Sequence, residues 1–217
     1  KEIVKLQKDN IKGLVIDLQN NGGGSIQEAI KLAGMFIDIG PLSVLVDSKN
    51  KQTILKDYNH GSVYNGQIIV LINGNSASAS EFFAAALQDY NRALIIGSTS
   101  LGKASIQAIL PLQENYKEEF VKITIEKFYR ITGKSHQILG IEPDIALPVL
   151  FDSITPRENS YKTALKNDAI ITKARFSPLP RNYFPELIAL SQTRVKANVR
   201  FNEINTANEQ INALYNN

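Results

Sequence analysis

Three serine side chains lie within five residues of the sequence, at Ser76, Ser78 and Ser80. A serine hydroxyl becomes a nucleophile toward carbonyl carbons when a neighbouring base takes its proton. The residues that follow, 81–87, favour a helix, and the amino end of a helix offers backbone N–H groups to an oxyanion. A serine that precedes a helix more often serves as a cap. The cluster therefore indicates acyl-transfer chemistry only where the fold supplies a base.

Lys103 is the candidate base. It stands in the loop 98–107, flanked by Gly102 and Ala104, and no acid lies close to it in sequence. If a fold encloses such an ammonium group without a counter-charge, its pKa falls and the neutral amine can accept a serine proton. Taken alone, a lysine is more often an ordinary solvated side chain.

A run of three glycines, residues 22–24, lies between an expected strand and an expected helix. Ser25 and Glu28 form the Ser-x-x-Glu pattern of a capping box, which predicts that the helix starts directly after the glycines. Bare backbone N–H groups at this position suit an anion. The run lacks the residues of a P-loop and the spacing of a dinucleotide fold, so a phosphate is weakly supported. The oxyanion of a tetrahedral intermediate is an equally good occupant.

The elements that position these residues follow from the hydrophobic pattern. Short, continuous apolar runs predict strands buried on both faces, and their alternation with helical segments indicates an α/β fold with parallel strand pairing. The segment 40–66 predicts a hairpin without site chemistry, and a helical pattern runs from Pro185 to about Tyr215. The predicted strands of the core are 13–18, 67–72 and 92–97, and its predicted helices are 26–37 and 81–87.

The composition excludes several classes of protein. The 217 residues are 43% hydrophobic, enough for one sizeable domain or a domain with an appendage. The net charge of +3 is spread over mixed basic and acidic residues, so nucleic acid is not an expected partner, and no apolar run is long enough to span a bilayer. The chain has no cysteine. His60 and His136 lie in polar, turn-like settings that favour solvated surface positions, and no metal site is expected.

Six short segments, in their order along the chain, resemble the signature blocks of the carboxyl-terminal processing proteases, and most closely those of the tail-specific protease branch. The resemblance extends from about residue 10 to residue 148. Its specificity comes from the number of ordered blocks. The segments are 17–24 (DLQNNGGG), 76–81 (SASASE), 86–93 (ALQDYNRA), 102–103 (GK), 125–130 (IEKFYR) and 140–145 (GIEPDI).

The resemblance implies a Ser/Lys dyad. In this family the nucleophile lies 25 residues before the base lysine, which selects Ser78 over its two neighbours and matches the base to Lys103. A glutamine four positions beyond the lysine, which orients it in some members, matches Gln107. These assignments agree with the chemistry inferred from the residues themselves.

The resemblance also implies oxyanion donors and a supporting acid. The donors fall on the backbone N–H groups of Gly24 and of Ala79, the residue after the nucleophile. An aspartate implicated in the tail-specific branch matches Asp89, for which a structural role is the better interpretation. The family usually has Gly-Lys-Gly around the base, whereas Ala104 follows Lys103 here. Because alanine demands more ordinary backbone angles than glycine, a slight displacement of this loop is expected.

An architecture and an activity follow from the same resemblance. It implies a crotonase/ClpP-like α/β core over 1–150 and a mainly helical carboxyl-terminal extension over 151–217. The PDZ domain that normally precedes this core has no counterpart in the sequence, which opens on Lys1 and looks like an excised fragment. The implied activity is that of a serine endopeptidase that needs neither cofactor nor metal and cleaves proteins near nonpolar carboxyl termini. The implied setting is the bacterial periplasm or cell envelope, with an adaptor lipoprotein as a partner.

Two alternatives come from other classes of protein. A peptide-binding or scaffolding module could keep this fold without catalysis. The joint presence of Ser78 and Lys103 argues against such a module, whereas the missing amino-terminal region and Ala104 leave it open. An acyl-CoA enzyme could use the same architecture and glycine-borne oxyanion donors. The sequence shows no obvious basic cluster for the CoA phosphates.

Overall fold

Continuous apolar runs build a parallel sheet. The computed structural model describes residues 1–113, 116–181 and 183–215. The four strands of this sheet are parallel and lie in the order β1-β4-β5-β8, so the three predicted strands and their parallel pairing are confirmed. The burial predicted for the first strand is wrong, because β1 lies at the edge of the sheet and Val15 is 59% exposed. The strands are β1 (Gly13–Asp17), β4 (Gln67–Ile72), β5 (Leu94–Gly97) and β8 (Ile145–Ala146).

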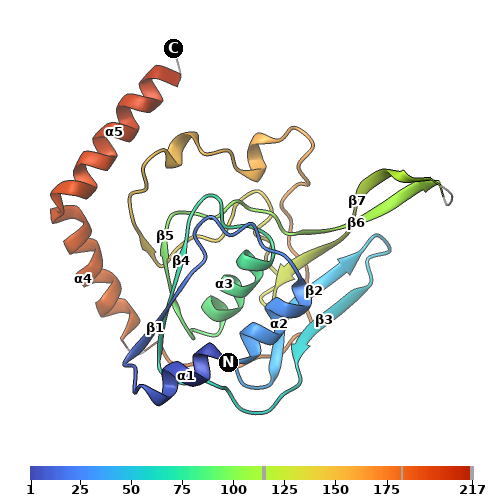
Figure 1. The fold of residues 1–217 in the computed structure, drawn as a ribbon, viewed down its shortest axis with the longest axis horizontal. Helices are drawn as coiled ribbons and strands as arrows, with labels where there is room; N and C mark the ends of the chain where they lie inside the picture. Colours follow the sequence, from blue (N-terminus) through green and yellow to red (C-terminus); the bar gives the residue numbers. More distant parts are fainter. Residues whose placement is uncertain (114–115, 182, 216–217) are drawn as a thin grey trace.

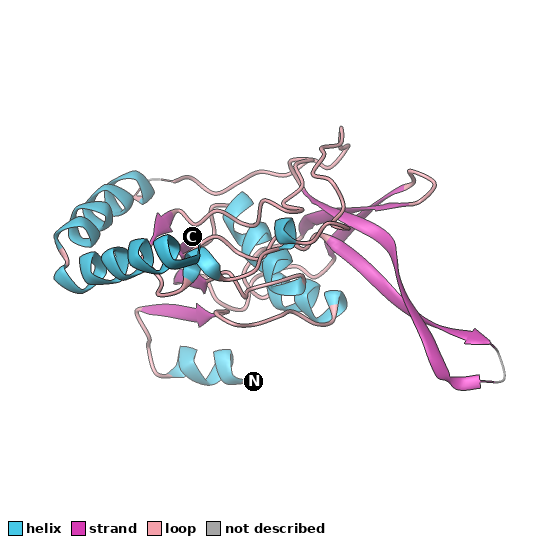
Figure 2. Ribbon diagram, turned by 90° about the horizontal axis from the view of Figure 1, so that it is seen from above, coloured by secondary structure: helices cyan, strands magenta, loops and turns pink. Residues whose placement is uncertain are grey.

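A second sheet is antiparallel, with the strand order β3-β2-β7-β6. The hairpin predicted within 40–66 is confirmed as β2–β3. A longer hairpin, β6–β7, was not predicted and projects away from the helices (Figure 2). Its apolar side chains do not alternate cleanly between buried and exposed positions, and Ile109 and Phe120 are both more than half exposed. The strands are β2 (Gly40–Asp47), β3 (Gln52–Asp57), β6 (Ser105–Gln113) and β7 (Tyr116–Arg130).

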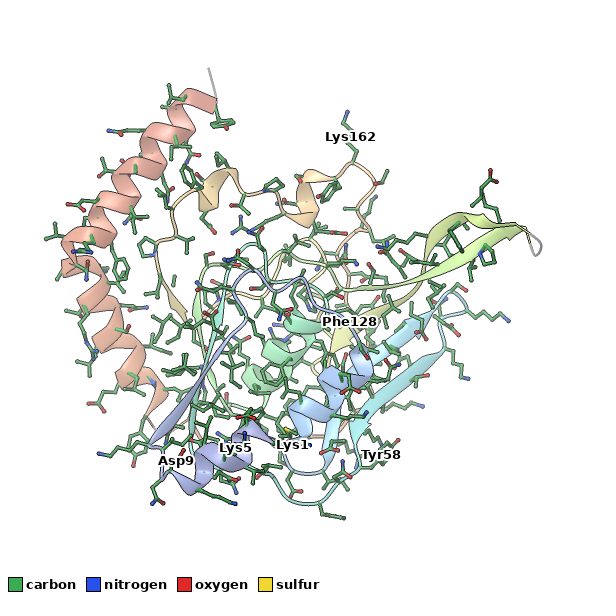
Figure 3. All side chains as sticks on the ribbon, viewed as in Figure 1. Lys1, Lys5, Asp9, Tyr58, Phe128 and Lys162 are labelled. Carbon is green, nitrogen blue, oxygen red and sulfur yellow. The ribbon has the colours of Figure 1, made fainter. Side chains whose placement is uncertain are left out.

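Helix α3 lies between the two sheets (Figure 1) and supplies much of the core. Phe82 of α3 meets Phe128 of β7 edge-on, with ring centroids 6.3 Å apart, at the junction that Figure 3 labels. On the other side, Phe83 meets Phe36 edge-on at 6.0 Å. Burial of one such aromatic side chain contributes about 1.5–3 kcal/mol. The core therefore holds α3 firmly. The helices of this half are α1 (Glu2–Lys8), α2 (Ile26–Gly34) and α3 (Ala79–Asp89).

Two helices close the chain where one continuous helix was predicted. The pattern from Pro185 to about Tyr215 is interrupted at Asn198, which has an extended ψ of 115°. The side-chain oxygen of Asn198 accepts the N–H of Phe201 at 3.2 Å, so Asn198 caps the second helix. No helix in the described part of the chain is long and apolar enough to cross a membrane. The elements here are η1 (Asp152–Ile154), η2 (Glu158–Ser160), α4 (Phe184–Ala197) and α5 (Val199–Tyr215).

The surface position predicted for His136 is wrong. His60 is exposed as expected, but His136 is only 2% exposed, and its ring packs against Phe128 with the centroids 5.0 Å apart. Neither ring nitrogen has a hydrogen-bond partner among the described residues. Burial lowers the pKa of His136 to about 3, so the ring is neutral at pH 7.

Candidate active site

A sharp turn between β4 and α3 presents Ser78. This residue has φ 57° and ψ −114°, a positive φ that suits glycine rather than serine and that turns the chain abruptly from strand to helix. The buried Ser76 hydroxyl donates to the carbonyl of Leu18 at 2.7 Å, and the Ser80 hydroxyl donates to Asn21 Oδ1 at 2.9 Å. Two of the three serines are thus engaged in structural hydrogen bonds. Of the three, only Ser78 lines the cavity described below.

The glycine loop, residues 21–25, packs directly onto the turn at residues 73–78 between β4 and α3, here called the serine turn. Asn21 joins them, because its carbonyl accepts the N–H of Ala77 at 3.0 Å and its side-chain oxygen accepts the N–H of Gly23 at 3.0 Å. Gly23 has φ 89°, and a Cβ atom there would lie 2.6 Å from the Ala77 carbonyl and 2.7 Å from the Ala79 nitrogen. Only glycine fits this position. The predicted oxyanion donors, Gly24 and Ala79, therefore belong to two segments in close contact.

Glu81 joins the serine turn to the lysine loop, residues 98–104. Its side chain is almost fully buried. Oε2 accepts the N–H groups of Ser78 at 2.8 Å and of Lys103 at 2.9 Å. Oε1 accepts the N–H of Gly102 at 2.7 Å and the hydroxyl of Ser100 at 2.5 Å. Burial raises the pKa of the Glu81 carboxyl, and the four hydrogen bonds oppose that rise. One carboxylate thus fixes the backbone at both Ser78 and Lys103.

Ala104, the departure from the family pattern, is fully buried. Its N–H donates to Gln137 Oε1 at 2.8 Å, and its carbonyl accepts the N–H of Phe128 at 3.0 Å. Its φ is not positive, unlike that of Gly102. Alanine therefore fits this position without the backbone angles that require glycine.

One open cavity of about 500 Å³ gathers the residues predicted from the sequence. Ser78, Lys103 and Gln107 line it together with Gly24 and Ala79. Lys103 is half-buried, and its ammonium group makes no hydrogen bond or ion pair with any residue that the structure describes. Gln107 is exposed on β6. The arrangement brings a hydroxyl, an amine and backbone N–H groups to one surface, as acyl transfer requires.

Asp89 lies at the opposite end of α3 from Ser78 and does not line this cavity. Its Oδ1 forms an ion pair with Arg130 Nη2 at 2.6 Å. Burial raises the pKa of the Asp89 carboxyl, and the Arg130 guanidinium opposes that rise. The pair ties α3 to β7. A second cavity of about 480 Å³ lies at this end of α3, lined in part by Tyr90 and Phe176, and contains none of the predicted site residues.

Several residues that shape the site were not identified from the sequence. Glu81 was predicted only as the first residue of the helix 81–87, and because glutamate is rarely buried unless it is paired, nothing in the sequence indicated its burial. Asn21 and Gln137 act on segments far away in sequence, which no local pattern shows. Lys122 lines the cavity from β7 and was missed with the hairpin that carries it.

The chain is similar to known peptidases. Residues 1–147 match the model of peptidase family S41. Over 175 residues the chain is 38% identical to a tail-specific protease of Haemophilus influenzae, an alignment that covers 78% of this chain and 25% of that protein. Over 144 residues it is 42% identical to a carboxy-terminal-processing protease of Bartonella bacilliformis, covering 66% of this chain and 32% of that protein.

A solved structure supports the same relationship. The photosystem II D1 C-terminal processing protease superposes with a TM-score of 0.60 at 33% identity, over 66% of this chain and 36% of that one. The chain thus spans about a quarter to a third of the length of the curated relatives named above. Because the family model matches 147 of the 217 residues, the chain belongs to peptidase family S41.

Proposed function

We propose that this chain is the catalytic core of a serine endopeptidase with a Ser78/Lys103 dyad. The observation that carries the proposal is that both side chains line one cavity while both backbones bond to the carboxylate of Glu81. The glycine loop reaches the same cavity. The names of the similar proteins, tail-specific and carboxy-terminal-processing proteases, support a peptidase activity.

In the proposed reaction the neutral amine of Lys103 takes the proton of Ser78 Oγ, which attacks the scissile carbonyl carbon. The carbonyl oxygen becomes an oxyanion and accepts hydrogen bonds from the N–H groups of Gly24 and Ala79. The intermediate collapses, and the leaving amine takes the proton from Lys103. Water then attacks the acyl-enzyme with Lys103 again as base, which releases the new carboxyl end and restores Ser78.

The surroundings of Lys103 suit a base. Its ammonium group has no acidic partner among the described residues, and the nearby Glu81 carboxylate already accepts four other donors. Gln107, on the same cavity, is the proposed orienting group for this amine.

The proposed substrates are proteins cleaved near nonpolar carboxyl termini. The side chains of Ile26, Ile106 and Phe128 contribute apolar surface to the cavity, which supports nonpolar residues beside the scissile bond. We further propose a crotonase/ClpP-like core over 1–150 with the extension 151–217, and a periplasmic or cell-envelope setting with an adaptor lipoprotein. The bacterial origin of the similar proteases is consistent with that setting.

Cleavage of an unfolded protein with a nonpolar carboxyl terminus tests the proposal, using the natural full-length protein that contains this chain. We expect Ser78→Ala and Lys103→Ala each to lower kcat by on the order of 10⁴-fold or more while both variants stay folded. Ser80→Ala is the matched control, because it removes a neighbouring hydroxyl, in the first turn of α3, that bonds only Asn21 among the described residues. It should retain activity within about tenfold.

Two outcomes would contradict the dyad. In one, either Ser78→Ala or Lys103→Ala matches an active wild type. In the other, the folded wild type binds the unfolded protein but does not cleave it, which would favour a peptide-binding module.

A further inference from the structure

Residues 152–160, which we call the strap, cross the lysine loop from outside the core. The strap contains η1 and η2 and follows β8, beyond the residues 1–147 that match the family model. It forms part of the gold segment above the core in Figure 1, and Lys162, labelled in Figure 3, projects into solvent just after it. The boundary proposed at residue 150 separates the strap from the core in sequence, but the strap bonds to the lysine loop at several points.

The first set of contacts centres on Arg157. Its Nε and Nη2 donate to the carbonyl of Thr99 at 3.2 Å and 3.0 Å. Asp152 fixes the guanidinium in place, because its Oδ1 pairs with Nη2 at 2.8 Å and its carbonyl accepts from Nη1 at 2.9 Å. The same Oδ1 accepts the hydroxyl of Ser98 at 2.6 Å. The Arg157 side chain is mostly buried, so this arrangement is shielded from water.

The second set of contacts centres on Glu158 and reaches both sides of Lys103. The N–H of Glu158 donates to the carbonyl of Leu101 at 3.0 Å. Its Oε1 accepts Gln137 Nε2 at 3.0 Å, and Gln137 Oε1 in turn accepts the N–H of Ala104 at 2.8 Å. The strap therefore bonds the loop directly before Lys103 and, through one glutamine, directly after it.

The strap and Glu81 hold complementary groups of the same loop. Glu81 accepts the N–H groups of Gly102 and Lys103 from the core side, whereas the strap donates to the carbonyls of Thr99 and Leu101 from the other side. Residues 98–104 have no helix or strand to fix them. These hydrogen bonds, together with the backbone bonds of the loop to Ser76, Ile138 and Ile141, therefore set its position.

We propose that the strap holds Lys103 in register with Ser78, and that Arg157 and Glu158 are positioning residues for the base. This inference rests on the proposed function. Without Arg157 the carbonyl of Thr99 turns to water, the loop loosens, and the Lys103 amine spends less time within reach of Ser78 Oγ. Binding of the substrate on the glycine side of the cavity is unaffected.

Arg157→Ala tests the first contact, measured beside Arg181→Ala in the natural full-length protein. Arg181 is a matched control because it also follows the family core and also forms one ion pair, with Asp144 at 2.8 Å, but it touches no part of the lysine loop. We expect Arg157→Ala to lower kcat at least tenfold with KM within about twofold. Arg181→Ala should leave kcat and KM unchanged.

Glu158 allows a test that keeps the shape of the side chain. Glu158→Gln retains an oxygen that can accept Gln137 Nε2, whereas Glu158→Ala does not. We expect the glutamine variant to retain most of the wild-type kcat and the alanine variant to lose it without a matching rise in KM. Equal losses of kcat in the two variants would contradict the positioning role of this side chain.

Amide hydrogen exchange at 102–104 separates failure of the strap from failure of the proposed function. We expect faster exchange there in Arg157→Ala than in Arg181→Ala and wild type. If the wild type cleaves and Arg157→Ala alters neither kcat nor exchange, the strap proposal is wrong although the dyad stands. If the two arginine variants lose kcat equally, the effect of Arg157 is one of general stability and the proposal also fails. If Arg157→Ala speeds exchange but the wild type does not cleave, the proposed function fails, and with it the role of the strap in catalysis.

Discussion

The lysine loop and the glycine loop approach Ser78 from different segments and are held very differently. The lysine loop has its N–H groups at Gly102 and Lys103 bonded by the buried Glu81, and its outer carbonyls bonded by Arg157 and Glu158. The glycine loop is exposed throughout 21–25. Its contact with the serine turn depends on the close approach of Gly23 and on the hydrogen bonds of one asparagine.

This difference separates the two tasks of the proposed reaction. The base must already be placed when substrate arrives, because proton transfer depends on the distance and direction between Lys103 and Ser78. The oxyanion donors act only after a carbonyl has entered the cavity, and the exposed glycine loop can settle around that carbonyl. In the proposed reaction the buried loop therefore sets the position of the base, and the exposed loop presents the oxyanion donors.

The largest effect is expected when the hydrogen bonds of the buried lysine loop are disturbed. In Glu81→Gln, the amide NH₂ replaces one oxygen and faces donors instead of accepting from them. We expect kcat to fall at least about 100-fold and the free energy of unfolding to fall by about 1–3 kcal/mol, because two buried donors lose their acceptor. Kinetics and denaturant unfolding measure both. Glu28→Gln, which alters an exposed ion pair with Lys31, should change stability by less than about 0.5 kcal/mol. An active, fully stable Glu81→Gln variant would show that the link is dispensable.

The next effect is expected in the exposed glycine loop, on activity and, through backbone strain, on stability. Gly23→Ala places a Cβ atom 2.6 Å from the Ala77 carbonyl and forces the glycine loop away from the serine turn. Displacement of an oxyanion donor typically lowers kcat by about 10²–10³-fold. Gly22→Ala is the matched control, because its Cβ would meet nothing within 4 Å. Equal kcat values for the two variants would mean that the glycine loop does not bind the oxyanion.

The smallest effect depends on pH and concerns the segment beside the lysine loop. His136 precedes Gln137, and its folded pKa of about 3 lies below the ordinary value of 6.5. Between these values the unfolded chain binds a proton that the folded chain does not, so stability is lost as pH falls from about 6.5 toward 3. At pH 5 the expected loss is about 2 kcal/mol relative to pH 7.

His136→Leu should remove most of that loss, and His60→Leu, at an exposed position, should leave it intact. Urea unfolding of both variants at pH 7 and pH 5 measures the difference. An acid sensitivity that persists unchanged in His136→Leu would assign it to other groups.

The core strands could be predicted because each is a continuous apolar run. Such a run can be recognised without knowing which distant segments it contacts. Ser78 and Lys103 could also be selected from the sequence. Ser78 lies between an apolar strand and a helix, Lys103 lies in a loop without nearby acids, and six ordered blocks resemble one family. The β6–β7 hairpin was not predicted because its apolar side chains are largely exposed and do not alternate cleanly with polar ones. The burial of His136 and the link from Arg157 to Thr99 depend on contacts between distant segments, which no local pattern encodes.

The backbone angle of Ser78 sets the proposed activity of this residue against the stability of the fold. A non-glycine residue held at φ 57° carries roughly 1–3 kcal/mol of strain, more than the roughly 0.5–1 kcal/mol of chain entropy that glycine costs. Mutation to glycine would thus remove the hydroxyl and favour the fold at the same time. If the proposed dyad is right, Ser78→Gly would therefore stabilise the fold while abolishing cleavage.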